Sequence, residues 1–218
     1  LMHNKQEVPE NWYVSYKASA FDGIEAECRC GSFVSYGMEF VSAYEVNSSL
    51  KKPNAVSEYE HFINICMDHG LEQVRKQMEY MLLSDFAITN EDRHFNNFGI
   101  LRDAVSLRFI SLAPVFDSGN SMFFRTGKKK PLTRSEILGM KITSFHDREE
   151  KVIRHIADRG CLKAGSLPAP EDVFKFYTKK QIPRNRAELI AENYKVKLGL
   201  LEDFQNGLSV SEYREKHS

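Results

Sequence analysis

A stretch of nine residues, 89–97, interrupts an otherwise apolar part of the sequence, and eight of the nine are polar or charged. Apolar residues at helical spacing precede it over 71–88, and a short apolar run follows at 98–101. A polar stretch between two apolar elements predicts a loop that both elements hold in place. Loops on rigid supports commonly carry binding and catalytic groups. The sequence therefore indicates a functional site at 89–97.

A second polar signal follows this loop, after a predicted β-hairpin. The apolar runs 98–101 and 107–110 flank a short polar segment, which predicts the hairpin. The next apolar run, 113–116, ends in a lone carboxylate, Asp117, directly before a Ser-Gly turn. We therefore treat Asp117 as a second candidate functional residue.

The order of the polar residues in these two segments is typical of phosphoryl transfer from a nucleotide. That chemistry needs a carboxylate that accepts the proton of the attacking hydroxyl, and oxygen ligands that hold Mg²⁺ on the phosphates. Asp92, four residues, Asn97, a hairpin and then Asp117 reproduce this order. The pattern assigns Asp92 as the base, and Asn97 and Asp117 as Mg²⁺ ligands. Each residue alone also fits an ordinary turn, so the interpretation depends on their joint order.

The remaining sequence predicts a small β part followed by a larger helical part, an α+β fold. Short β-rich runs separated by turn signals predict three or four antiparallel strands within 12–46. Helical spacing begins near residue 57 and is broken at Gly70. Beyond the hairpin, further helices are predicted at 133–139, 145–158, 171–179 and 185–204. The change from strands to helices places the domains at 1–50 and 51–218.

The charge balance limits the classes of partner. Lys and Arg number 30 and Asp and Glu number 30, a formal net charge of zero that argues against direct binding of nucleic acid or an anionic membrane. No apolar run approaches the roughly 18–20 residues of a membrane span. Four cysteines without a CxxC pair or a neighbouring histidine favour a reducing environment, with neither zinc nor a disulfide. These features predict a cytoplasmic protein.

Two segments carry a resemblance to a known family. Residues 90–100, Asn-Glu-Asp-Arg-His-Phe-Asn-Asn-Phe-Gly-Ile, and residues 113–121, Ala-Pro-Val-Phe-Asp-Ser-Gly-Asn-Ser, together resemble the HipA-like serine/threonine kinases, which are toxin-type bacterial kinases. The Asp-Arg-His-x-x-Asn core is also similar to the catalytic loop of phosphatidylinositol kinases. The likeness covers roughly 12–125, and beyond 125 only the helical character agrees.

The resemblance implies a protein-kinase-like α+β fold, with a mainly helical C-terminal lobe and remnant strands of the small lobe. It implies ATP and Mg²⁺ as cofactors, a protein substrate that carries Ser or Thr, and a possible antitoxin-type partner. The roles of Asp92, Asn97 and Asp117 stay as the spacing assigned them. His94 is counted with the catalytic residues. We expect it to brace the loop by a hydrogen bond rather than to act as a general base. The region 28–33 resembles the hinge, so Cys30, Gly31 and Phe33 are expected to contact adenine.

The sequence departs from the family pattern at its start. A kinase needs a phosphate-covering loop and a strand lysine that pairs with the phosphates. No Gly-rich loop is recognisable, and Lys5 and Lys17 are candidates by residue type only. We therefore expect a fragment or a truncated form of a kinase. Two alternatives stay open: a non-catalytic regulatory or toxin–antitoxin-type binding module, and a lipid or small-molecule kinase.

Overall fold

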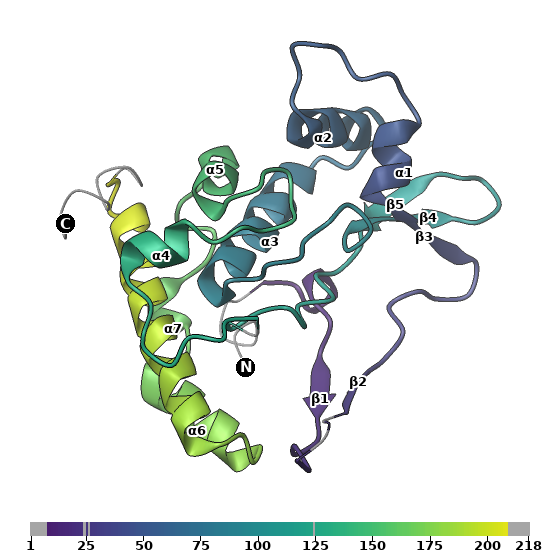
Figure 1. The fold of residues 1–218 in the computed structure, drawn as a ribbon. Coiled ribbons are helices and arrows are strands. Elements are labelled where there is room, and N and C mark those ends of the chain that lie inside the picture. The colour runs from purple at the N-terminus through teal and green to yellow at the C-terminus, as the bar shows by residue number, and fades with distance from the viewer. Residues whose placement is uncertain (1–7, 24, 26, 124, 209–218) are drawn as a thin grey trace.

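The computed structural model describes residues 8–23, 25, 27–123 and 125–208 (Figure 1). Its strands are β1 (Tyr16–Ala18), β2 (Cys28–Cys30), β3 (Met38–Ser42), β4 (Gly99–Asp103) and β5 (Phe109–Leu112). Its α-helices are α1 (Ala43–Ser48), α2 (Glu58–Asp68), α3 (Val74–Ile88), α4 (Arg134–Leu138), α5 (Glu149–Val152), α6 (Pro170–Lys179) and α7 (Arg184–Gln205). Short 3₁₀ turns complete the fold at η2 (Glu10–Trp12), η3 (Ile153–His155) and η4 (Ala164–Ser166). Within the described ranges, no helix is both long and apolar enough to cross a membrane.

The strands form two separate antiparallel sheets. β1 pairs with β2, and β3, β4 and β5 form a three-stranded sheet in that order. The predicted hairpin is confirmed as β4–β5. β4 approaches β3 so closely that a Cβ on Gly99 would lie 2.0 Å from the carbonyl oxygen of Val41. Only glycine fits there, so Gly99 sets the position of the strand that follows the polar loop.

The last strand of the predicted β region 12–46 ends at Ser42, because a helix begins at Ala43. The Ser42 hydroxyl accepts a hydrogen bond from the Glu45 backbone N–H (3.2 Å), and the Glu45 carboxylate accepts one from the Ser42 backbone N–H (2.9 Å). This reciprocal capping box satisfies two backbone donors at the start of α1. The Ser-x-x-Glu pattern is visible in the sequence, but the β-rich run that precedes it obscured the change.

The main hydrophobic core surrounds α3, which lies at the centre of the helical part (Figure 1). Every residue from 78 to 87 of this helix is buried. α2 packs on one side, and the long helix α7 packs on another. Gly70, with φ +88°, ends α2 as predicted and turns the chain into α3. A helix buried all round is a rigid support for the loop that follows it.

Three of the four later helix predictions are confirmed, by α4, α6 and α7. The predicted helix 145–158 is wrong in about half of its length, since only the short helix α5 and the 3₁₀ turn η3 form there. Ile156 is already extended, with φ −86° and ψ +110°. The apolar residues that suggested a helical period are anchored separately in the core, Val152 and Ile153 from the short helical segment and Phe145 from the chain before it.

The N-terminal segment packs onto the helical part. The Trp12 ring lies 5.6 Å from the Tyr80 ring of α3, centroid to centroid. The Val115 N–H donates to the Trp12 carbonyl (2.7 Å), and the Val14 N–H donates to the Val115 carbonyl (3.0 Å). One hydrophobic cluster contains Trp12 and Val41 together with the residues of α2 and α3. The domain boundary near residue 50 stays a prediction.

Candidate active site

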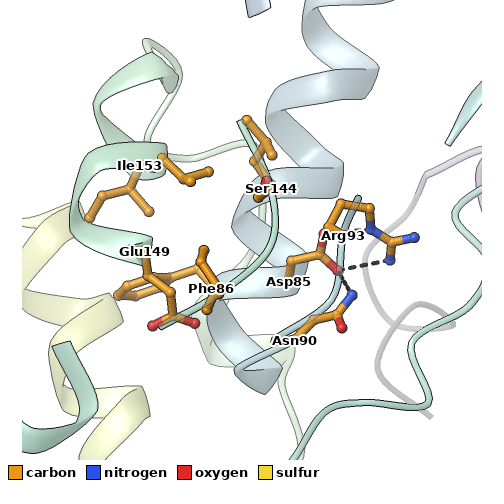
Figure 2. Close-up of a pocket in the computed structure, with 10 residues that line it drawn as sticks. Asp85, Phe86, Asn90, Arg93, Ser144, Glu149 and Ile153 are labelled. Atoms are coloured by element: carbon orange, nitrogen blue, oxygen red, sulfur yellow. Dashed lines mark hydrogen bonds and ion pairs between the residues drawn. The ribbon is translucent and has the colours of Figure 1, made fainter. Parts of the chain in front are cut away.

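A buried ion pair fixes the polar loop to the end of α3. Arg93 is 1% exposed. It donates two hydrogen bonds to the Asp85 carboxylate of α3, from Nε to Oδ2 at 2.8 Å and from Nη2 to Oδ1 at 2.9 Å. The Asn90 side-chain amide donates to the same carboxylate at 2.9 Å, so Asp85 lies between Arg93 and Asn90 (Figure 2). Bidentate arginine–carboxylate pairs fix the relative orientation of the two side chains as well as their distance. The first turn of the loop is therefore held rigidly on the helix.

The same guanidinium joins the loop to the segment directly before Asp117. Arg93 Nη1 donates to the carbonyl of Asn97 at 2.7 Å and also to the carbonyl of Phe116. Asn97 and the neighbour of Asp117 therefore share one donor. The residue pattern alone assigned no role to Arg93. The signal that could have found it is Asp85, a carboxylate in the mainly apolar helix segment 80–88.

Asp92 is held by the segment that follows Asp117. Its side chain is 23% exposed, and its Oδ2 accepts a hydrogen bond from Asn120 Nδ2 at 2.9 Å. The Glu91 N–H also donates to the Asn120 carbonyl at 2.9 Å. Arg125 lies 3.7 Å from Oδ2 and is more than half exposed. Asp92 thus presents a fixed carboxylate that solvent, and so an incoming hydroxyl, can reach.

The two predicted metal ligands have oxygen atoms available. Asn97 Nδ2 donates to the Asp92 carbonyl at 3.0 Å, and no described residue hydrogen-bonds to the Asn97 Oδ1. Asp117 is exposed, and no described residue forms a salt bridge with its carboxylate. Its backbone is left-handed, with φ +49°, and its N–H donates to the Tyr16 hydroxyl at 3.1 Å.

This donor set suits Mg²⁺ with a nucleotide. In the part of the chain that is described, no group of three or more His, Cys, Asp or Glu residues could hold a metal ion. Mg²⁺ on a nucleotide needs only one or two protein oxygens, because phosphates and water supply the other ligands. Asn97 Oδ1 and the Asp117 carboxylate fit that requirement.

His94 forms a local hydrogen bond within the loop, and its catalytic role stays a prediction. Its Nδ1 accepts a hydrogen bond from the Asn96 backbone N–H at 3.2 Å. The neighbouring Phe95 ring packs on Phe98 and Phe145, at centroid distances of 5.8 Å and 5.1 Å. This contact attaches the outer part of the loop to the aromatic core.

Two of the three residues expected at adenine lie close to Asp117. Phe33 packs on Phe116, with ring centroids 5.1 Å apart. Cys30 is the register partner of Tyr16, the residue whose hydroxyl accepts from the Asp117 N–H. Burial raises the pKa of Tyr16, and the charges of Cys30 and Asp117 add to that rise. Gly31 is exposed, with no atom within 4 Å of where its Cβ would lie.

The candidate phosphate lysines receive no support. Lys5 lies outside the described residues. Lys17 is exposed and follows Tyr16 in β1. Successive side chains of a strand face opposite sides, so Lys17 is on the face away from Asp117.

The fold is that of a kinase-like α+β protein, as the sequence predicted. The structure is similar to the solved structure of the Helicobacter pylori proinflammatory kinase CtkA, with a TM-score of 0.58. The alignment covers 98% of this chain and 84% of that chain at 12% sequence identity. No protein-family model and no curated protein matches the sequence. The likeness establishes the kinase-like fold alone.

Proposed function

We propose that the chain is a HipA-like kinase that transfers phosphate from ATP, with Mg²⁺, to Ser or Thr of a protein substrate. The observation that carries the proposal is the position of Arg93, which donates to both Asn97 and Phe116. This one side chain brings the loop of Asp92 and the turn of Asp117 to the same place, in a kinase-like fold.

Each residue has a defined part in this chemistry. Asp92 orients the substrate hydroxyl and accepts its proton. Asn97 Oδ1 and the Asp117 carboxylate would hold Mg²⁺, which neutralises charge on the phosphates when bound. Phe33 and the backbone near Cys30 would contact the adenine. Positioning supplies most of the rate in phosphoryl transfer, and the Arg93 contacts supply that positioning.

The second candidate is a non-catalytic regulatory or toxin–antitoxin-type binding module. The observation that favours it is the position of Lys17 on the face opposite Asp117, so that no clamp for the α- and β-phosphates is recognised among the described residues. A lipid or small-molecule kinase would use the same three residues with another acceptor.

Two measurements separate these functions. Calorimetry should show weak ATP binding that requires Mg²⁺ and that Asp117→Asn weakens further. Equal affinity with and without Mg²⁺ would contradict the metal assignment. Radiolabelled ATP should then label a Ser/Thr protein substrate rather than phosphoinositide vesicles. Labelled lipid would support the lipid kinase, and Mg²⁺-independent binding with no transfer would support the module.

A further inference from the structure

A second concave site, with a lining distinct from that of the candidate active site, lies between α6, α7 and the segment that follows Asn120. Its volume is about 400 Å³, within the range that accommodates a small organic ligand. The walls are mainly apolar and aromatic, and they include Ile88, Met122, Val173, Phe176, Tyr177 and Tyr194. None of the residues expected to bind ATP or Mg²⁺ lines it.

The hollow is held open by contacts that fix its walls. α6 and α7 pack on each other around a small cluster of their own, formed by Val173, Ile190 and Tyr194 (Figure 1). Arg186 at the start of α7 donates to the carbonyl of Phe123 at 2.6 Å and to that of Thr126 at 3.3 Å. The segment that carries Met122 is thereby tied to α7.

The opposite wall is anchored in a similar way. The Tyr194 hydroxyl donates to the Pro168 carbonyl at 3.1 Å, which ties the chain before α6 to α7. The Met122 N–H donates to the Ile88 carbonyl at 2.8 Å. The walls are therefore connected by hydrogen bonds on both sides, which makes a preformed pocket rather than a gap between mobile parts.

The charged residues of the rim select the ligand. Lys175 and Lys179 lie one turn apart on α6 and both line the hollow. Neither ammonium group forms a salt bridge with a described residue. Asp172 is the other charged residue at the rim, so two positive charges face one negative charge. An apolar hollow with a cationic rim fits a molecule with an apolar body and an anionic end.

We propose that this hollow, formed by Met122, Val173, Tyr177 and Tyr194 and bordered by Lys175 and Lys179, binds a small amphipathic anion. The apolar body, aromatic or acyl, contacts the aromatic walls, and the anionic end lies at the two lysines. Two wall residues connect the hollow to the catalytic loop: Ile88 ends the helix before the loop, and Met122 follows Asn120. The proposal goes beyond the proposed phosphotransfer and does not depend on it.

The test uses two fluorescent probes of similar shape, the anion anilinonaphthalene sulfonate and the neutral phenylnaphthylamine. We expect wild-type protein to bind the anion with a dissociation constant in the micromolar range. Val173→Trp, which fills the hollow, should abolish binding of both probes. The double variant Lys175→Gln, Lys179→Gln should weaken the anion about tenfold and leave the neutral probe unchanged.

Matched controls make the result decisive. Lys195→Gln removes the same charge from the other groove of the same helix pair and should change neither probe. Excess Mg²⁺-ATP should not displace the anion, and circular dichroism reports the fold of each variant. Displacement by ATP, an unchanged affinity in the double lysine variant, or no binding to folded wild-type protein would each overturn the proposal.

Discussion

Asn120 and Asp92 are joined side chain to side chain across 28 residues of sequence, with Asn120 Nδ2 2.9 Å from Asp92 Oδ2. The Asn120 backbone is fixed as well, because its carbonyl accepts from the Glu91 N–H. The direction of the Asp92 carboxylate therefore depends on the turn that follows Asp117. If Asp92 is the base, Asn120 is its positioning residue.

We expect Asn120→Ala to lower the rate of phosphotransfer about tenfold with little change in ATP affinity, because only the orientation of the base is lost. Asn120→Asp should lower it further, since a second carboxylate repels Asp92. Steady-state kinetics separates kcat from the KM for ATP. A rise in that KM with kcat unchanged would place Asn120 at the nucleotide instead. Ser121→Ala, one residue further on, is the control.

Substitutions of Asp92 and Asp117 should differ in their effects on phosphotransfer and on nucleotide binding. Asp92→Asn should retain Mg²⁺-ATP affinity and lower phosphotransfer on the order of 10²-fold or more, because the base is lost while the metal ligands stay. Asp117→Asn should also weaken Mg²⁺-ATP binding, because a charged ligand is removed. Calorimetry and a radiolabel assay on the same preparations measure the two effects. Wild-type rates in Asp92→Asn would show that the mechanism is wrong.

Arg93 should contribute to the free energy of unfolding through its ion pair with Asp85. It should contribute to Mg²⁺-ATP affinity through its hydrogen bonds to the carbonyls of Asn97 and Phe116. Arg93→Met leaves the Asp85 carboxylate buried without its cationic partner, and we expect a loss of about 3–5 kcal/mol in the free energy of unfolding. The double variant Asp85→Leu, Arg93→Met removes both charges and should regain much of that loss. It should not regain Mg²⁺-ATP affinity, since the carbonyls of Asn97 and Phe116 have lost their shared donor. Urea unfolding measures the stability of the double variant, and calorimetry measures its Mg²⁺-ATP affinity. Recovery of both quantities would show that Arg93 has only a structural role.

The loop and the hairpin could be predicted because their signals are local, a change of polarity and two adjacent apolar runs. The partners within the site could not. Arg93 reaches Asp85 eight residues back and Phe116 beyond the hairpin, and Asn120 reaches Asp92 across the hairpin. Such pairs depend on tertiary packing, which the periodicity of a single sequence does not report. The wrong helix at 145–158 has the same origin, since its apolar residues are spaced for core contacts.

A second buried ion pair connects α5 to α7. Lys197 is fully buried, forms a salt bridge with Glu149, and lies with its Nζ 3.6 Å from the centre of the Phe86 ring. We expect Lys197→Met to cost about 3–5 kcal/mol of unfolding free energy, because Glu149 is left buried and unpaired. The double variant with Glu149→Leu should recover most of this in urea unfolding. Arg184→Met, which breaks the exposed pair with Glu188, is the control and should cost about 1 kcal/mol or less.

Two neighbouring histidines, His146 and His155, should make the free energy of unfolding depend on pH. His146 and His155 lie within 4° of parallel, with Nε2 atoms 3.0 Å apart and ring centroids 5.2 Å apart. The centroid distance nearly equals the Nε2–Nε2 distance plus the two ring radii, so the rings meet edge to edge in one plane. One Nε2 donates its hydrogen to the other. Full protonation of both rings would place two N–H groups against each other.

Burial lowers the pKa of both histidines. The charges of Lys151 and Arg154 add to this for His146, and the charges of His146 and Arg75 do so for His155. Asp147 raises the pKa of His146 and Glu60 raises that of His155, without reversing either shift. A folded pKa below the unfolded value of about 6.5 means that the unfolded chain binds more protons. The free energy of unfolding should therefore be highest above that pH and fall as the pH drops through it.

Urea unfolding between about pH 7.5 and pH 5 measures this dependence. His146→Gln should flatten it, because glutamine keeps a hydrogen-bonding side chain but cannot be protonated. His69→Gln removes an exposed imidazole that stacks on Phe109, away from the pair, and should leave the dependence as it is in wild type. Stability that rises toward pH 5, or an equal slope in wild type and His146→Gln, would contradict the shared-hydrogen arrangement.

His155 also stacks on Tyr59 and faces Phe145, the ring on which Phe95 of the loop packs. Protonation of the pair should therefore loosen the loop as well, and the Phe95 ring signals in NMR spectra should shift over the same pH range.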